Sequence, residues 1–362
     1  MGSATRTAPT APTGPRAGAT RAATPLALRL GAAASRGALR GLLRASILLG
    51  LLLPLRLGTY QLTVLTIALV YAVALASVVV LTGYVGQVSL CQVSFMGLGA
   101  FLCAALMGHF GLSYWVAAPL TVAMVFVAGV AAGLPALRLR GLTLAIVTLS
   151  LALLADNFLF QGVGWLTNNG NHWRVARPTL FGAPLDKPGV LFDFVLIAVA
   201  ITLYAIVRLR QGRTGKSWYA MRDAEIAAAT SGVPVVPLKL LGFGIAAALA
   251  AVAGVLYALA VGSVSPEPFT FVYSIQLLAI AVIAGIRSLP GALVGALFVI
   301  ILPQFLQQFP ALVPLTSLIL GAGLIVQMIF APQGIGGSIE QLGRRLFART
   351  AAAGQEGDHA SV

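Results

Sequence analysis

Charged residues are scarce in this chain of 362 residues, at 9% against about 25% in soluble domains. Hydrophobic residues reach 59%, where soluble domains have about 45–50%. So few charges cannot cover the surface of a soluble fold, which excludes a soluble enzyme, a disordered protein and an ordinary nucleic-acid binder. The charge balance is basic, with 23 Lys and Arg against 9 Asp and Glu. In so apolar a chain, this excess indicates contact with membrane lipid at the cytoplasmic face.

Cysteine and histidine are also rare. Cys91 and Cys103 are twelve residues apart, which is about 18 Å along a helix, so they cannot pair within one. We interpret both as small hydrophobic residues. The three histidines are scattered and the sequence has no CxxC pair. These patterns predict no metal site and no bound cofactor.

Residues 57–137 contain no Asp, Glu, Lys or Arg. This stretch is far longer than the roughly 20 residues that one membrane crossing needs. The apolar runs are continuous and rich in Leu and Ala, which favours helices over alternating strands. The predicted fold class is all-α, a polytopic transmembrane helical bundle of about ten spans. A broken or re-entrant helix is the alternative for the third span. The expected spans are 42–59, 60–82, 88–107, 114–137, 141–160, 189–209, 239–262, 271–287, 291–309 and 315–331.

Residues 1–44 are basic, contain no acidic residue and have too little apolar content to fold. They lack the apolar run and small-residue cleavage site of a secretory signal, so we expect a disordered cytoplasmic tail. The transmembrane domain is expected over 45–338, followed by a cytoplasmic tail over 339–362. With both termini inside, 19 Lys and Arg fall on the inner side and 4 on the outer side. This distribution follows the positive-inside rule.

Two hydrophilic segments interrupt the apolar runs. Residues 161–188 are expected outside, where Trp165 and Trp173 suit either the membrane interface or a docking surface. Residues 208–238 are expected inside. Within them, 217–232 predict a short Ala-rich helix that ends at Gly232, before two prolines. Such a helix suits a rigid lever at the cytoplasmic surface, and the alternative is an amphipathic interfacial helix.

The residues that would supply chemistry are absent. The text GRTGKS lacks the first glycine of a P-loop, because position 210 is Arg, so we expect no ATP hydrolysis by this chain. Asp156 and Asp193 lie near span ends, and Glu267 lies in an expected outer loop. No expected span therefore has a charge near its middle, and this argues against ion-coupled transport. No catalytic triad or carboxylate pair stands out. The chain is therefore expected to be no enzyme, and either a partner supplies the energy for transport or the chain is a passive pore.

Four segments resemble one known family. Residues 212–257 (GRTGKSWYAMRDAEIAAATSGVPVVPLKLLGFGIAAALAAVAGVLY) are similar to the EAA-type loop and following helix of branched-chain amino acid ABC transporter permeases. Residues 81–102 (LTGYVGQVSLCQVSFMGLGAFL), 134–149 and 330–337 resemble further parts of the same family. The segments occur in the family's order, and the order is closest to the LivM-type subunit.

The resemblance implies a permease subunit of an ATP-driven importer in the cell membrane, for branched-chain or related amino acids. Such a subunit works with a second homologous permease subunit, two cytoplasmic ABC ATPases that bind the ATP, and an extracytoplasmic solute-binding protein. The EAA helix would sit in a groove of an ATPase, where Ala227 and Ala228 would allow close packing and Glu225 would offer a carboxylate. By position, the ATPase-coupling residues would be Arg222, Asp223, Glu225, Ala227, Ala228 and Gly232.

Uncharged polar and small residues mark a candidate substrate path. They would either bond helix to helix or line a wet route, since polar groups in hydrocarbon need partners. These candidates are Gly83, Gly86, Gln87, Ser89, Gln92, Ser94 and Thr148. Gln304, Gln307 and Gln308 would also share one helix face.

The sequence departs from the family pattern at Cys91, where the family usually has Gly, and at 167–170 and 284–287, which replace glycine-rich turns. These departures leave the solute open between leucine-like amino acids and related solutes such as urea or short amides. An ion-coupled secondary transporter or a channel for a small polar solute stays the alternative function.

Overall fold

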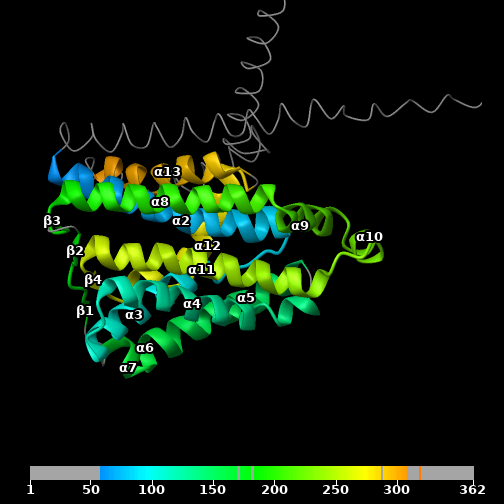
Figure 1. Cartoon of the computed structure of the whole chain (residues 1–362), viewed down its shortest axis with the longest axis horizontal. Coiled ribbons are helices and arrows are strands. Elements are labelled where there is room, and N and C mark those ends of the chain that lie inside the picture. Colours follow the sequence, from blue (N-terminus) through cyan, green and yellow to red (C-terminus); the bar gives the residue numbers. More distant parts are fainter. Residues whose placement is uncertain are drawn as a thin grey trace, which may run out of the picture. The chain divides into compact units, whose positions relative to one another are not determined.

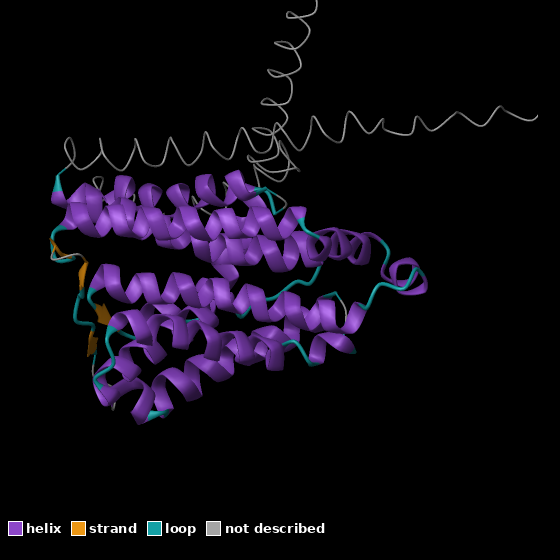
Figure 2. Ribbon diagram, viewed as in Figure 1, coloured by secondary structure: helices purple, strands orange, loops and turns teal. Residues whose placement is uncertain are grey.

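The computed structural model describes residues 58–139, 141–168, 172–180, 183–286, 288–307 and 318. The chain is almost entirely helical over these residues, with a few very short strands (Figure 2). The predicted all-α helical bundle is confirmed for the described residues. The expected tails at 1–44 and 339–362, the span at 315–331 and nearly all of the span at 42–59 lie outside the described residues.

Six helices of the described part are long and apolar enough to cross a membrane. They run over Thr59–Val85, Gln92–Phe110, Tyr114–Ala132, Leu142–Gly162, Pro188–Gln211 and Val235–Val261. Each corresponds to one of the spans expected between residues 60 and 262. The labels are α2 (Thr59–Val78) with its π-helical end η1 (Val79–Val85), α3 (Gln92–Phe110), α4 (Tyr114–Ala132), α5 (Leu142–Leu154) with π-helical η3 (Ala155–Leu159) and α6 (Phe160–Gly162), α8 (Pro188–Gln211) and α11 (Val235–Val261).

The expected span at 271–287 forms a shorter helix, α12 (Phe271–Ala284). Its 14 residues extend about 21 Å at 1.5 Å per residue, less than the roughly 30 Å of a hydrocarbon core. Helix α13 (Leu289–Gln307) follows it. The remaining elements are α7 (Gly164–Thr167), α9 (Arg213–Asp223), α10 (Glu225–Thr230), the 3-10 turns η2 (Pro135–Leu137) and η5 (Glu267–Phe269), and the strands β1 (Trp173–Arg174), β2 (Thr179–Leu180), β3 (Ala183–Pro184) and β4 (Ser263–Val264).

The third expected span is not broken, because the break lies before it. Helix α2 widens into the π-helix η1 and stops at Gly86, whose φ of 80° is left-handed and suits glycine. The following residues, 87–91, are not helical, and α3 begins only at Gln92. Short π-helical segments often mark functional sites, which directs attention to this break.

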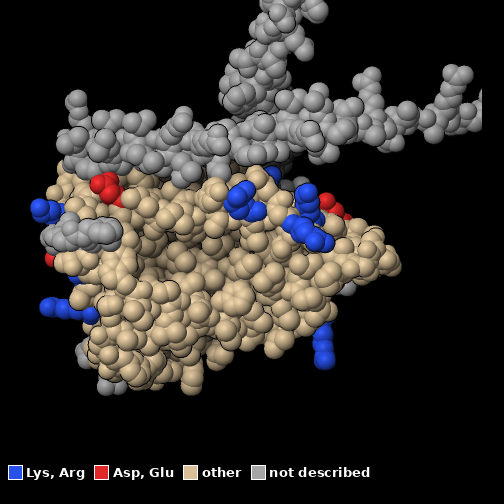
Figure 3. Space-filling view, in the orientation of Figure 1, with Lys and Arg blue, Asp and Glu red and all other residues tan. Residues whose placement is uncertain are grey.

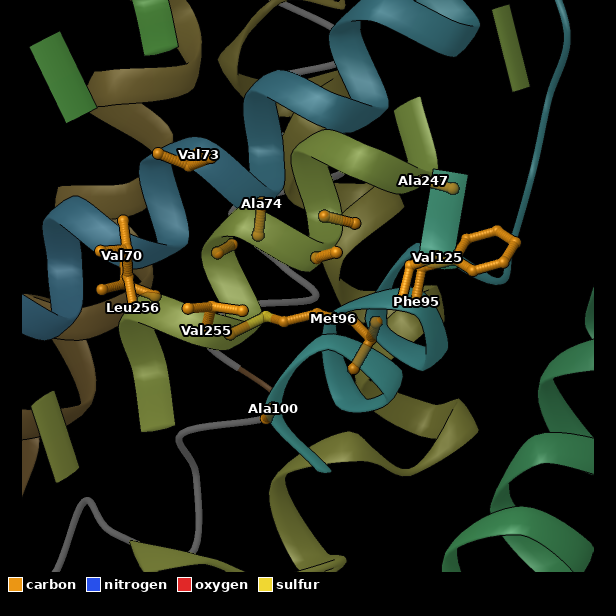
Figure 4. Packing of buried hydrophobic residues seen from close by; sticks show 14 of the residues in the cluster. Val70, Val73, Ala74, Phe95, Met96, Ala100, Val125, Ala247, Val255 and Leu256 are labelled. Carbon is orange, nitrogen blue, oxygen red and sulfur yellow. The ribbon is translucent and has the colours of Figure 1, made fainter. Parts of the chain in front are cut away.

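Helix α11 is the central element and packs against α2, α3 and α4. Small residues let its backbone approach α3 closely: a Cβ on Gly254 would lie 1.9 Å from the carbonyl oxygen of Met96. On the facing helix, a Cβ on Gly99 would lie 2.6 Å from the Cα of Ala251. Figure 4 shows Met96 of α3 packed beside Val255 of α11. Such contacts between small residues are the usual means of tight helix packing in membranes.

The connections gather at two opposite ends of the helices (Figure 1). One end holds the break at 86–91 together with α9 and α10. The other end holds both two-stranded sheets, β1–β4 and β2–β3, of which the first pairs Trp173 with Val264. Residues 161–188 and the segment after α11 therefore share an end, as the expected topology requires. Charged side chains lie toward these two ends on the face shown in Figure 3.

Candidate functional site

The segment between α8 and α11 forms two short helices rather than the single helix expected over 217–232. Helix α9 already begins at Arg213, because Gly212 ends α8 in an extended conformation. Ala224, with φ −154° and ψ 86°, separates α9 from α10. Gly232 ends this pair as predicted: its φ is 82°, and Val233 N–H donates to the Ala228 carbonyl at 3.0 Å in a Schellman-type cap.

Buried contacts attach α9 and α10 to the start of α11. The Trp218 side chain is fully buried, and its indole N–H donates to the Leu238 carbonyl at 2.9 Å. Lys239 is 2% exposed, and its Nζ lies 2.8 Å from Oε1 of Glu225. Glu225, expected to offer its carboxylate to an ATPase, thus pairs within the chain instead. Both short helices are therefore attached to the start of α11.

Arg222 joins α9 to the break after α2. Its guanidinium donates a hydrogen bond to the Gly83 carbonyl, and its side chain lies against Gly86 so closely that a Cβ there would fall 2.3 Å from its Cγ. Asp223, which is largely exposed, holds the guanidinium from the other side at 2.9 Å. Arg222 therefore points back into the helix bundle and not outward to a partner.

Aromatic rings continue this contact. The Arg222 guanidinium lies 5.4 Å from the ring centre of Tyr219, which lies 5.5 Å from the ring of Tyr84 in η1. The guanidinium of Arg210, at the end of α8, lies 5.6 Å from the ring centre of Tyr84. A cation placed over the face of an aromatic ring is attracted to that ring. These contacts link α8, η1 and α9, and of the four residues sequence analysis had selected only Arg222.

The surface of α10 carries the remaining predicted coupling residues. Ala228 is buried, whereas Ala227 is exposed. Ile226 beside it is 74% exposed, which leaves a large apolar side chain uncovered at this end. An exposed isoleucine on a helix that projects from the bundle (Figure 1) fits a protein contact. The sequence signal for it was present, since Ile226 is the one large apolar residue among the alanines of this helix.

Predicted path residues come together at the break between α2 and α3. The Leu90 backbone N–H donates to Thr148 Oγ1 of α5 at 3.0 Å. Ser77 of α2 lies 3.2 Å from Gln92 Oε1 at the start of α3. Ser89 Oγ contacts Cys91 Sγ at 3.2 Å, so the departure at position 91 stabilises the turn. These residues fix the non-helical segment in place.

Some buried polar side-chain atoms at this break make no hydrogen bond within the described residues. Gln92 Nε2 and Ser94 Oγ are buried, and neither has a hydrogen-bond partner within the described residues. Gln87 is also buried.

A cavity of about 200 Å³ lies between α4, α8 and α11. It is lined by residues other than the predicted path residues, most of them apolar, among them Trp115 and Phe194. For Gln304 and Gln307 the structure describes only the backbone, and Gln308 lies outside the described residues.

The two tryptophans expected at the opposite end differ in role. Trp173 is 8% exposed, packs on Gly108 and donates its indole N–H to the Leu166 carbonyl at 2.8 Å. Trp165 is 46% exposed and stacks on His109, with ring centres 5.4 Å apart. Trp173 is thus structural, and Trp165 forms part of the surface.

At the same end of the helices, a hydrogen bond from the Ser265 side chain lowers the pKa of Glu267.

Within the described residues no group of three His, Cys, Asp or Glu could hold a metal ion. Six apolar helices long enough to cross a membrane, joined by short connections and a helix pair bonded to one of them, are the features of a polytopic membrane protein. The family described as "Branched-chain amino acid transport system / permease component" matches residues 60–328, and the chain belongs to it. It is an integral plasma-membrane protein and the permease subunit of an ABC importer. In this family ATP hydrolysis resides in separate subunits, so the chain is not an enzyme.

Two curated relatives carry the same printed name, "High-affinity branched-chain amino acid transport system permease protein LivM". The protein of Escherichia coli strain K12 is 31% identical over 301 residues, covering 77% of this chain and 70% of the relative. The protein of Salmonella typhimurium strain LT2 is 30% identical over 305 residues, covering 78% and 71%. No solved structure matches the chain.

Proposed function

We propose that the chain forms one half of the transmembrane part of an importer for branched-chain or related amino acids. A second homologous permease subunit, two cytoplasmic ATPases and an extracytoplasmic solute-binding protein would complete it. The names of the two relatives support this solute class. The scarcity of charge within the spans supports it as well, because an uncharged path passes a zwitterion without holding it.

The end that carries α9 and α10 is proposed to face the cytoplasm, together with both termini. Its described part holds seven basic residues: Arg138, Arg208, Arg210, Arg213, Lys216, Arg222 and Lys239. The opposite end holds three, namely Arg174, Arg177 and Lys187. The positive-inside rule supports this orientation.

One observation carries the proposed mechanism: Arg222 of the projecting helix α9 donates a hydrogen bond to Gly83 of η1, just before the break between α2 and α3. A partner ATPase that moves α10 through Ile226, Ala227 and its neighbours would shift α9 with it, because α10 follows α9 directly and the Lys239–Glu225 pair and Trp218 attach both helices to the start of α11. The shift would then reach Gly83 and Gly86, where the polar path residues begin. The coupling segment is thus proposed to act as a lever.

Uptake into vesicles tests this proposal. The tagged chain is purified with the subunits that accompany it and reconstituted with the binding protein, and ATP-dependent uptake of leucine is measured. We expect uptake only when ATP and all subunits are present. Flux of leucine down its gradient through the chain alone would favour the alternative, a secondary transporter or channel. Ligand screening of the binding protein separates leucine-like solutes from urea and amides.

A further inference from the structure

The helix over Leu142–Gly162 exposes a row of polar side chains. Thr143, Ser150 and Asn157 recur every seven residues, and Gln161 follows four residues later. All four are exposed. Residues seven apart in an α-helix lie close to one face, so these side chains form a row, with apolar side chains exposed between its members. We call them the polar stripe.

Helix α4 and the middle of α8 expose a different surface. Every exposed side chain within α4 is apolar, and the large ones are Trp115, Val116, Leu120, Met124 and Val127. The middle of α8 exposes Ile197 and Ile201. These faces have the composition that contact with lipid tails requires. The polar stripe does not, because polar groups in hydrocarbon are costly unless they find partners.

Bonds within the helix satisfy only part of the polar stripe. Ser150 Oγ donates to the Ile146 carbonyl at 3.1 Å, and Asn157 Nδ2 donates to the Leu153 carbonyl at 2.9 Å. An asparagine side chain carries a second N–H and an acceptor oxygen, and a serine hydroxyl has two lone pairs. The exposed faces of these side chains therefore offer hydrogen bonds to water, a solute or another protein.

The polar stripe also connects to a buried carboxylate. Gln161 Nε2 lies 3.5 Å from Oδ1 of Asp156, whose other oxygen accepts the backbone N–H of Phe271 at 3.3 Å. Phe271 begins α12, which packs beside α5 and exposes Gln276. Gln276 adds an exposed polar side chain on this neighbouring helix, and the π-helix η3 contains both Asp156 and Asn157.

We propose that the polar stripe lines a water-filled solute route where this chain meets a second permease subunit, a proposal that rests on the proposed function. Helix α5 lies at the edge of the bundle, on the side away from α8 (Figure 1), so a partner can approach it. Apolar residues such as Ile146 and Leu154 are exposed between the polar ones. This mixture suits a small zwitterion with an apolar side chain, whose polar and apolar parts both find contacts.

Cysteine labelling in the assembled transporter tests the proposal. Ser150→Cys and Asn157→Cys are compared with Met124→Cys and Leu120→Cys, which lie at similar depths on the apolar face of α4. The native Cys91 and Cys103 are buried and serve as background. A membrane-impermeant methanethiosulfonate reagent is applied, and the labelled fraction is followed by mass spectrometry. Only a thiolate reacts, so we expect the two stripe variants to label at least about tenfold faster than the two controls.

Equal, slow labelling of all four variants would overturn the proposal, because it would place the polar stripe in lipid or in a dry contact. ATP-dependent leucine uptake by the same preparations keeps the two proposals apart. Uptake without stripe labelling would reject the polar stripe and leave the proposed function standing. Stripe labelling in a transporter that takes up no amino acid would reject the proposed solute class and support a wet route.

Discussion

Lys239 and Glu225 form a salt bridge of 2.8 Å across the start of α11, with the lysine almost completely buried. Removing one partner of a buried pair leaves the other charge without compensation. We therefore expect Glu225→Ala to lower the free energy of unfolding by about 3 kcal/mol. Thermal unfolding of the purified protein in detergent measures this.

Asp223→Asn is the matched control, because the Arg222–Asp223 pair is mostly exposed on the aspartate side, at 67%. Exposed pairs contribute about 0–1 kcal/mol, so its Tm should stay near that of the unchanged chain. If Glu225→Ala unfolds at the same temperature as Asp223→Asn, the pair does not hold α10 to α11.

Gly86 is the second point at which the coupling segment meets the break. Gly86→Ala places a side chain in a left-handed conformation and against Arg222 Cγ, at 2.3 Å. We expect it to displace Arg222 and to reduce leucine uptake per ATP hydrolysed in the reconstituted transporter. Gly111→Ala creates the same backbone strain, with φ 61°, but nothing lies within 4 Å of the new methyl group. Similar uptake per ATP in both variants would show that contact with Arg222 at Gly86 is unimportant.

Ile226 is expected to anchor an ATPase subunit. A buried apolar side chain of this size contributes about 1.5–3 kcal/mol, so Ile226→Ser should weaken ATPase binding on the order of tenfold or more. Co-purification of the ATPase with the tagged chain measures the loss. Thr230→Ala, on the same exposed helix, should leave binding unchanged. Retention of the ATPase by Ile226→Ser would place the docking contact elsewhere.

Local sequence signals predicted the parts of the fold that depend on neighbouring residues. Long apolar runs located the six long helices between residues 59 and 261, because hydropathy over about 20 residues decides whether a segment crosses a membrane. Gly232, with proline two residues later, gave the end of α10, since only glycine readily adopts that backbone conformation. The break at Ala224 was missed, because alanine favours helices and nothing in the local sequence marks the change.

Contacts between distant residues were beyond such analysis. Arg222 bonds to Gly83, 139 residues earlier, and Thr148 accepts a bond from Leu90, 58 residues away. The family resemblance selected Arg222 and Glu225 as coupling residues and offered the Glu225 carboxylate to an ATPase, whereas the structure directs both side chains into the chain. Their neighbours Tyr84, Tyr219 and Lys239 carry no local mark of function. The polar stripe could be identified only from the exposure of each residue in the helix over Leu142–Gly162.

The central claim is that α9 transmits motion to the break through Arg222. Arg222→Gln removes the charge and the stack on Tyr219, and Arg213→Gln on the same helix is the control. In vesicles that hold the complete transporter, ATP hydrolysis and leucine uptake are measured together. We expect Arg222→Gln to keep hydrolysing ATP while uptake per ATP falls on the order of tenfold, the loss that corresponds to about 1.4 kcal/mol of coupling. Unchanged uptake per ATP in Arg222→Gln would contradict the account.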